Sequence, residues 1–453
     1  MHRKGLLFLL IGFPAVMLTA PVPSIAHAAT YFVDPSSGND TADGSAEHPW
    51  RTIARTQRDL TRGDIIILMP ADYGDVVFTP AKKGENGDYA TYRSAPAKHG
   101  RAVFSHIAFR NADMHIAIEG CEIENTGTHD SCIQVENASA VRIVACKIHG
   151  QLNAAGPTHA NVVVRNSKNV LIDRCEIYCS GPSAHGVQME GSNAVTVRGC
   201  HVHDIVSSGI RTHGGEDYTI EHNIVHDQQA DWNPSVHGSG ISVRSHGTTL
   251  RSNIIYNYGN TRPIRFYPDY AGPEGYRNMR VENNLVYKTL DFPGVQWWTE
   301  FLDVGPNCVF CNNTFVGDVV MILATRSDGS GLSLFNNIVT GRLQLDPSQK
   351  WPNIRHGNNI LGQLASKGCG WLCFRSDFTP GGSNKVGTKC TVGGFFKNGA
   401  AHYPYIEGPP YQLNGQSPAV DWASDEHAPP TDLLCRPRRG RADAGCFEQI
   451  PPP

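Results

Sequence analysis

The chain has 453 residues, with 39 Lys and Arg against 42 Asp and Glu, which gives a formal net charge of −3. This balance excludes a general nucleic-acid-binding surface, because such a surface needs an excess of basic residues. With 46 glycines and only 18% charged residues, the composition is typical of a turn-rich β protein rather than a helical one.

Residues 1–28 have the pattern of a signal peptide. Basic residues at 2–4 precede an apolar run at 5–20 that a proline interrupts, and "AHA" at 26–28 supplies small residues for cleavage. The alternative, a membrane anchor, needs a longer unbroken apolar run. We therefore expect a mature chain that begins at Ala29, is secreted or periplasmic, and has no membrane span.

Residues 29–105 form the next segment. A short strand, "YFVD", is followed by a Gly- and Asp-rich turn, a helix start at "PWRTI" and an apolar strand at "GDIIILMPADY". We interpret this segment as an N-terminal cap with the first coil of the repeats that follow.

Residues 106–365 repeat one short pattern. Each repeat has a Cys or Asn anchor followed by two or three apolar positions, and successive anchors are 22 to 31 residues apart. A second alternating strand, such as "GVQME" or "GISVR", precedes most anchors. Strand-built repeats of this length predict a parallel β-solenoid. The anchors are Cys121, Cys146, Cys175, Cys200, Asn223, Asn253, Asn284, Asn313, Asn337 and Asn359.

Stacking explains both the strands and the anchors. One coil cannot bury its apolar face alone, whereas coils stacked about 4.8 Å apart bury these faces together and pair their backbones. Asn side chains in one column can hydrogen-bond along the axis, and Cys is a small residue that replaces Asn in the first four coils. A leucine-rich repeat is the main alternative, but its Leu-x-x-Leu-x-Leu spacing is absent.

Residues 366–453 lie outside the repeats, and we interpret them as an irregular C-terminal cap. The chain has 13 cysteines, and five of them lie here. We expect one or two disulfides to pin this cap in an exported chain. For the four anchor cysteines we expect free buried thiols, and we assign no redox or zinc role to the single pair Cys308 and Cys311. The five are Cys369, Cys373, Cys390, Cys435 and Cys446.

Together these motifs resemble the secreted right-handed parallel β-helix proteins of the pectin-lyase-like superfamily. The segments "PWRTI" and "GDIIILMPADY" are similar to the N-terminal cap of such proteins, and "SPAVD" with "RADAGCFE" is similar to their closing segment. The resemblance covers most of the mature chain. It implies an all-β, right-handed parallel β-helix in a single domain, and a family that includes pectate, alginate and chondroitin lyases, uronate epimerases and glycosidases.

Four histidines fall at or beside the anchor turns of successive coils. Two of them occupy places that become Tyr256 and Tyr287 later in the chain, so we interpret the group as structural or surface residues. A metal site is the alternative, but no His-x-x-x-His helix or Cys-x-x-Cys pair lies among them, and we predict no metal ligands. The four are His201, His203, His222 and His226.

Chemistry is expected on the outward face of the strands that precede the anchors. Strand alternation points pairs such as Val187 and Met189 inward and their neighbours outward. In the middle coils the outward neighbours would form one patch, although they are far apart in sequence. The patch is expected to contain Gln188, Glu190, Arg211, His213, Arg244, Arg265 and Tyr267.

This patch suits an acidic polysaccharide, because Arg can pair with a uronate carboxylate. β-Elimination at a uronic acid needs a cation to neutralise the carboxylate and a base to remove the adjacent proton. We predict Arg211, His213, Arg244 and Tyr267 as catalytic residues. The substrate-binding candidates are Gln188, Glu190, Arg265 and, from nearby loops, Trp232, His237, Tyr270 and Trp297.

The sequence departs from a calcium-dependent pectate lyase, because the outward columns offer Glu136 and Glu190 but no Asp cluster. No cofactor is predicted, and calcium is the one ion left open. A glycoside hydrolase would need two facing carboxylates, for which Glu190 with Glu216 or Asp217 is a candidate. A non-catalytic glycan-binding or adhesion solenoid is the other alternative. We expect an acidic polysaccharide as partner, no nucleic acid, and a monomer.

Overall fold

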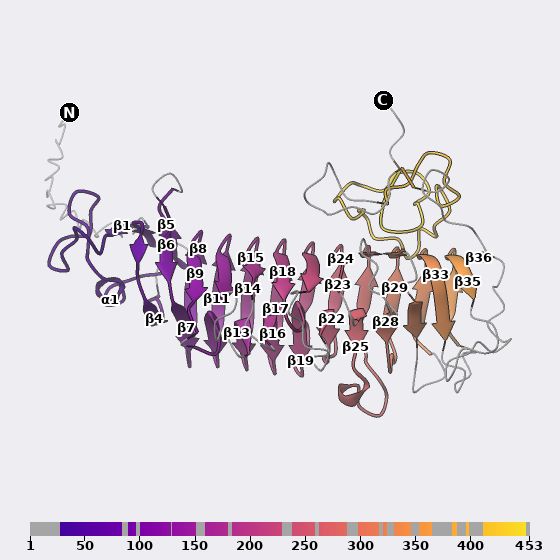
Figure 1. The fold of residues 1–453 in the computed structure, drawn as a ribbon, viewed down its shortest axis with the longest axis horizontal. Coiled ribbons are helices and arrows are strands. Elements are labelled where there is room, and N and C mark those ends of the chain that lie inside the picture. The colour runs from indigo at the N-terminus through magenta and orange to yellow at the C-terminus, as the bar shows by residue number, and fades with distance from the viewer. Residues whose placement is uncertain are drawn as a thin grey trace, which may run out of the picture.

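The protein forms an elongated stack of β-coils with little helix (Figure 1). The computed structural model describes residues 28–449 apart from 84–88, 97–99, 128, 151–158, 180–183, 229–237, 259–261, 288–297, 317–319, 324–329, 346–352, 365–382, 387–395 and 398–410. Each middle coil contributes three strands, and every strand pairs in parallel with its equivalents in the coils before and after it. The predicted parallel β-helix is therefore confirmed.

The strands fall into three parallel ladders, which we call ladders I, II and III. Ladder I is a sheet of its own, whereas ladders II and III are joined through β33, which pairs with strands of both. Ladder I consists of β1 (Thr30–Val33), β2 (Ile65–Leu68), β5 (Ala90–Ser94), β8 (Asp113–Glu119), β11 (Ser139–Val144), β14 (Lys168–Asp173), β17 (Asn193–Arg198), β20 (Thr219–Glu221), β23 (Thr249–Arg251), β26 (Arg280–Glu282), β29 (Cys308–Cys311), β32 (Leu332–Phe335) and β34 (Arg355–Gly357).

Ladder II contains the strands that precede the anchors in the coils. It consists of β4 (Asp75–Phe78), β7 (His106–Arg110), β10 (Ile133–Glu136), β13 (Ala160–Arg165), β16 (His185–Glu190), β19 (Ile210–His213), β22 (Ser239–Val243), β25 (Arg262–Phe266), β28 (Trp298–Phe301), β31 (Val320–Leu323) and the second half of β33 (Ile338–Leu345).

Ladder III contains the strands that follow the anchors. It consists of β3 (Ala71–Asp72), β6 (Ala102–Phe104), β9 (Glu122–Asn125), β12 (Lys147–Gly150), β15 (Glu176–Tyr178), β18 (His201–Ile205), β21 (Ile224–Gln228), β24 (Ile254–Tyr256), β27 (Leu285–Tyr287), β30 (Thr314–Phe315), the first half of β33, β35 (Ile360–Leu364) and β36 (Lys385–Val386).

Two short helices interrupt the strands. The helix expected at "PWRTI" is α1 (Ile53–Thr56), and the Thr52 side chain caps it by accepting a hydrogen bond from the Arg55 backbone N–H at 3.2 Å. The 3₁₀ helix η1 (Pro268–Tyr270) follows β25, in a loop that projects beyond the lower edge of the coils in Figure 1. No helix in the described part of the chain is long and apolar enough to cross a membrane.

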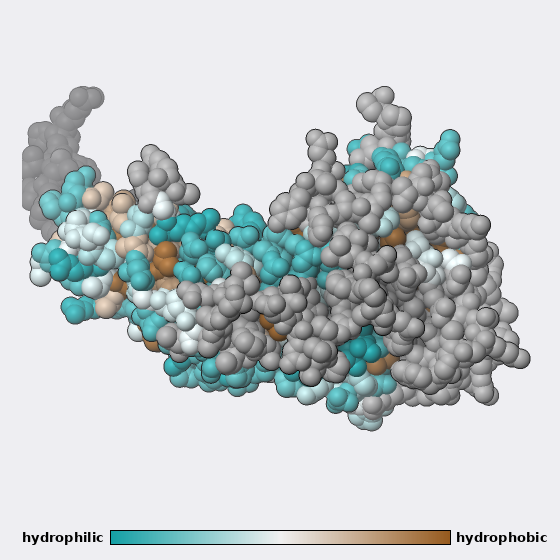
Figure 2. Space-filling view, viewed as in Figure 1, coloured by the Kyte–Doolittle hydropathy of each residue, from teal (hydrophilic) through white to brown (hydrophobic). Residues whose placement is uncertain are grey.

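The core is a set of apolar columns inside the coils. The predicted inward pairs on ladder II, from Ile133 and Val135 to Ile264 and Phe266, have no exposed surface. On the face shown in Figure 2, the described residues are mostly hydrophilic, with apolar atoms confined to small patches. Alternation along each strand therefore divides interior from surface side chains as the sequence predicts.

The anchor column is a continuous hydrogen-bonded ladder between ladders I and III. Each Asn amide donates to the side-chain oxygen of the Asn in the next coil at 2.9–3.0 Å, from Asn223 onward to Asn384. In three of the earlier coils the Cys thiol donates instead to a backbone carbonyl of the preceding coil, as Cys200 does to Ile172. All four anchor thiols are buried and free, as expected.

A left-handed backbone position precedes every anchor. The residue before the anchor has a positive φ in each coil, for example 68° at Gly120, 56° at His222 and 57° at Asn283. Asn and Gly tolerate this region better than other residues. The turn geometry therefore explains the "NN" pairs that recur in the later coils.

The predicted equivalence of the histidine and tyrosine positions on ladder III is also confirmed. His203 is in register with His226, which is in register with Tyr256 and then Tyr287. The rings stack, with centroids 5.4 Å apart for the first pair and 4.6 Å for the second. Burial and the neighbouring imidazoles of His203 and His226 lower the pKa of His201 to about 3.

The described part of the closing segment, residues 411–449, folds back along the side of the later coils (Figure 1). The side chains of Asn283 and Asn312 donate to the backbone carbonyls of Thr431 and Asp443 at 2.7 and 3.0 Å. This segment therefore covers the anchor turns as a lateral strap. Cys435 and Cys446 are free thiols, and the other three cysteines of the expected disulfides lie outside the described residues.

The Asn ladder yields a stability prediction. Asn284→Ala leaves the buried Asn253 backbone N–H and the Leu250 carbonyl without their side-chain partners, which lie at 3.0 and 2.9 Å. We expect the free energy of unfolding to fall by about 2–4 kcal/mol, because each unsatisfied buried polar group costs about 1–3 kcal/mol. Urea unfolding measures this loss. Thr219→Ala, at an outward position on β20, should change it by less than about 0.5 kcal/mol, and an equal loss in both variants would contradict the role of the ladder.

Candidate active site

The predicted outward residues of ladder II lie side by side in the structure. Gln188 is in register with Arg211, and Arg211 with Ser242, which is in turn in register with Arg265. In the adjacent column Glu190 is in register with His213. The four predicted catalytic residues, which we call the ladder II cluster, are Arg211, His213, Arg244 and Tyr267.

Arg211 lies beside a buried histidine. Its Nη1 atom is 2.7 Å from His185 Nε2, while the Ser208 backbone N–H donates to His185 Nδ1 at 3.1 Å. Burial, and then the charges of Arg211 and Arg244, lowers the pKa of His185 to about 3, so the imidazole is neutral. Both neighbours are donors and a neutral imidazole accepts at one nitrogen only, so in either tautomer the ring supplies no negative charge to the guanidinium. His185 therefore leaves the Arg211 charge unpaired.

His213 is oriented by a glutamate from the preceding coil. Its Nδ1 atom lies 3.5 Å from Glu190 Oε1, and the Arg165 Nε–H donates to the other oxygen of Glu190 at 2.8 Å. Gln188, which is buried, also donates to Glu190. Burial raises the pKa of the Glu190 carboxyl, but the hydrogen bonds from Arg165 and Gln188 outweigh it, so the pKa lies below its ordinary value. An ionised Glu190 holds the proton of His213 on Nδ1 and leaves Nε2 with a lone pair.

Tyr267 lies between two guanidinium groups. Arg244 and Arg265 each lie 3.9 Å from the centre of its ring, and Arg244 also lies 5.3 Å from the ring of Tyr270. The Tyr270 ring contacts His213 edge-on, with centroids 4.6 Å apart. These contacts connect Arg244, Tyr267 and His213 into one group. Among the described residues, Tyr270 is one of two large hydrophobic side chains that are exposed, at 37%.

Sequence reasoning missed a buried glutamate, Glu300, at the next position of this face. It is in register with Arg265 on β28 and only 2% exposed. Its carboxylate forms ion pairs with Arg262 at 2.6 Å and Arg265 at 3.1 Å. The charge of Arg265, predicted to bind substrate, is therefore already compensated. The alternating pattern of "WTEF" could have indicated that Glu300 points outward. The long loop before β28 prevented us from predicting from the sequence which residue of β25 it would lie beside.

Arg211 and Arg244 differ from Arg165, Arg262 and Arg265 of the same face, each of which pairs with a glutamate. No carboxylate in the described ranges lies within ion-pair distance of either guanidinium. The Nε atoms of both are buried without a hydrogen-bond partner. Burial and the neighbouring charge of Arg244 lower the pKa of Arg211. Two adjacent, partly buried cations are unfavourable without an anion, so this arrangement favours an anionic ligand.

Three of the predicted substrate-binding residues, Trp232, His237 and Trp297, lie outside the described residues. The carboxylates suggested for a hydrolase contact different arginines. Glu216 is exposed and pairs with Arg277 at 3.8 Å, whereas Glu190 pairs with Arg165. Within the described part of ladder II, no three acidic or histidine side chains converge on a point where a calcium ion could bind.

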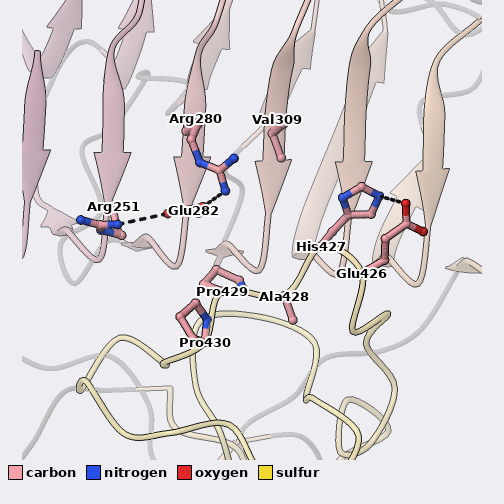
Figure 3. Close-up of a pocket in the computed structure, with 9 residues that line it drawn as sticks. All are labelled: Arg251, Arg280, Glu282, Val309, Glu426, His427, Ala428, Pro429 and Pro430. Atoms are coloured by element: carbon pink, nitrogen blue, oxygen red, sulfur yellow. Dashed lines mark hydrogen bonds and ion pairs between the residues drawn. The ribbon is translucent and has the colours of Figure 1, made fainter. Parts of the chain in front are cut away.

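The structure also has hollows away from ladder II. One, of about 320 Å³, lies between ladder I and the closing segment (Figure 3). Its charges are paired with one another, since Glu282 accepts from Arg280 at 2.7 Å and lies 3.7 Å from Arg251. Another, of about 330 Å³, is lined mostly by Asn, Ser and Ala. Neither combines an unpaired cation with a base, so neither is a candidate active site.

Comparison with known proteins agrees with this fold. Residues 105–267 match the family described as right handed beta helix region. A crystal structure of pectate lyase Pel9A superposes with a TM-score of 0.53 over 94% of this chain and 98% of that chain, at 14% identity. The fold and the match over residues 105–267 define the chain as a right-handed parallel β-helix protein.

More distant structures carry varied functions. A rhamnogalacturonan lyase matches with a TM-score of 0.35 and 15% identity over 59% of this chain and 84% of that chain. PfbA, a surface adhesin of Streptococcus pneumoniae, matches with a TM-score of 0.40 and 11% identity, over 68% of this chain and 84% of that chain. No curated protein sequence matches the chain. Because one fold can host many unrelated reactions, the reaction must be inferred from the site.

The buried glutamate yields a second prediction. Glu300→Gln leaves Arg262 and Arg265 uncompensated in a largely buried position. We expect the free energy of unfolding to fall by about 2 kcal/mol, less than for a fully buried pair because both arginines are partly exposed. Thermal unfolding measures the effect. The control is Glu426→Gln, which breaks an exposed pair with Arg355 and should have little effect. An unchanged midpoint for Glu300→Gln would show that this carboxylate does not stabilise the fold.

Proposed function

We propose that the protein is an exported polysaccharide lyase that cleaves a uronic-acid-containing polysaccharide by β-elimination at the ladder II cluster. The observation that carries the proposal is a pair of partly buried arginines, Arg211 and Arg244, that lie beside an oriented histidine and have no acidic partner among the described residues. A uronate carboxylate matches this pair in charge and in its capacity for bidentate hydrogen bonds.

The residues divide into three roles. Arg211 and Arg244 bind the uronate carboxylate and stabilise the negative charge that develops when the adjacent carbon loses its proton. His213, oriented through Nδ1 by Glu190, accepts that C5 proton on Nε2. The electron pair forms the C4–C5 double bond as the C4–O bond breaks, and the Tyr267 hydroxyl protonates the departing oxygen. One proton is taken up and one is delivered, so the step balances.

Two observations support this class of reaction over its alternatives. Inverting and retaining hydrolases need a protonated carboxylic acid near a second carboxylate. Glu190 and Glu300 are each paired with arginine instead. A binding solenoid needs exposed aromatic rings but no buried, unpaired cations. The burial of Arg211 beside His185 therefore favours an enzyme that acts on an anionic sugar.

The activity test uses purified protein and a panel of uronic-acid polymers, with ultraviolet absorbance of unsaturated ends as readout. We expect absorbance to rise on at least one polymer. His213→Ala should lower kcat by about 10²–10⁴-fold, the range for loss of a general base, while the control His246→Ala stays near wild type. Reducing ends without absorbance would indicate a hydrolase, and retention on a glycan column without either signal would indicate a binder.

A separate prediction concerns the arginines. Arg211→Ala should lower kcat/KM by about 10²–10³-fold, comparable to the loss of one preorganised donor to a developing negative charge. The control is Arg142→Ala, an exposed residue on ladder I. Methyl-esterified polymer, whose carboxylates are neutral, should be cleaved equally slowly by wild type and Arg211→Ala. An Arg211 effect that persists on the ester would contradict the assignment to the carboxylate.

A further inference from the structure

A second group of chemically active side chains lies on ladder III, away from the ladder II cluster. Glu176 is in register with His201, and Tyr178 with His203. One ligand atom each from Glu176, His201 and His203 lies within 4.8 Å of the others. His226, from the next coil, adds a fourth, because its Nε2 atom lies 2.6 Å from Nε2 of His201. Four potential ligands from three successive coils therefore converge on one place.

Two carboxylates define the protonation of this group. His203 Nδ1 lies 2.8 Å from Asp204, and His226 Nδ1 lies 2.9 Å from Asp227. A neutral imidazole that donates from Nδ1 presents a lone pair on Nε2. Both aspartates follow their histidines directly and have the same left-handed backbone, with φ of 50° and 45°. The coil repeat thus places two oriented lone pairs side by side.

Among the described residues, the Nε2 lone pair of His203 has no donor, whereas that of His226 lies 2.6 Å from Nε2 of His201. His203 Nε2 is buried and has no hydrogen-bond partner, although Glu176 Oε1 lies 3.5 Å away. An unsatisfied buried nitrogen costs about 1–3 kcal/mol. His149, two coils earlier in the same ring stack, makes the contrast clear, since its Nε2 atom lies 3.0 Å from Glu122 and its Nδ1 atom 3.2 Å from the Gly150 carbonyl. A histidine in this ring stack can therefore have both ring nitrogens satisfied by protein atoms, so ring stacking alone does not explain why the Nε2 atom of His203 faces Glu176 and His201.

We propose that Glu176, His201 and His203 bind a divalent transition-metal ion, with His226 as the nearest fourth ligand and Asp204 and Asp227 as the partners that orient the imidazoles. Imidazole and carboxylate donors suit Zn²⁺, and carboxylate-bound Nδ1 atoms are the usual second contacts of zinc-ligating histidines. The histidine spacing resembles neither a zinc helix nor a paired-cysteine site, and for this reason no metal ligands were predicted from the sequence. The ligands come instead from stacked strands.

Such an ion would fasten neighbouring coils. Side chains of β15, β18 and β21 would share one ion, so its binding would stabilise the native stack relative to the unfolded chain. Glu176 is 46% exposed, which gives the ion a path from solvent. A rearrangement of about 1 Å is required at His201 and His226, because ligands of a tetrahedral zinc ion with bonds of about 2.0–2.1 Å lie about 3.4 Å apart.

The test measures zinc binding directly in untagged, full-length protein stripped with EDTA. Titration calorimetry with ZnCl₂ should show one high-affinity site per chain, and zinc should raise Tm while EDTA lowers it again. Glu176→Gln and His203→Gln should each weaken binding by at least about tenfold. Asp204→Asn, which keeps every ligand, should weaken it by about 10–100-fold.

The matched control is Glu122→Gln, which changes the equivalent column position two coils earlier and should leave zinc affinity unchanged. Circular dichroism of each stripped variant shows whether the coil is intact. If Glu176→Gln does not fold, Asp204→Asn decides the result alone. Absence of a stoichiometric site in the wild type, or unchanged affinity in both folded Glu176→Gln and Asp204→Asn, would overturn the proposal.

Discussion

The structure depends on keeping successive coils in register, and the buried Asn column provides that constraint. A shift by one residue would turn every outward side chain inward, because side chains alternate along a strand. The side-chain amide of Asn313 donates to Asn337 at 2.9 Å and to the Val281 carbonyl at 2.8 Å, so each anchor is tied to the coil on either side. Such a chain of amides is satisfied only when all coils are aligned.

Register converts a linear repeat into two local chemical sites. On ladder II, the in-register stacking of coils brings together residues of β16, β19, β22 and β25. On ladder III, the same stacking brings together Glu176, His201 and His203. The two groups differ in electrostatics. Among the described residues, the first leaves two cations without anions and suits an anionic sugar, whereas the second leaves the Nε2 lone pair of His203 without a donor and suits a cation.

The sequence was sufficient for the fold and for much of the ladder II cluster. Anchor spacing and alternation placed Arg211 and His213 on one outward face, because both properties are local and periodic. They could not show that Glu300 compensates Arg265, since a loop of irregular length separates their strands. They also could not show that His201 and His203 converge with Glu176, because side-chain rotamers and the neighbouring Asp204 decide where an imidazole nitrogen points.

The central claim is that aligned coils create a binding place for a uronate carboxylate between two unpaired arginines. A crystal structure of the inactive His213→Ala variant with a bound uronic-acid oligosaccharide tests it most directly. The account predicts a sugar carboxylate within hydrogen-bond distance of both Arg211 and Arg244 on ladder II. An oligosaccharide bound on ladder I or ladder III, with these two guanidinium groups untouched, would contradict it.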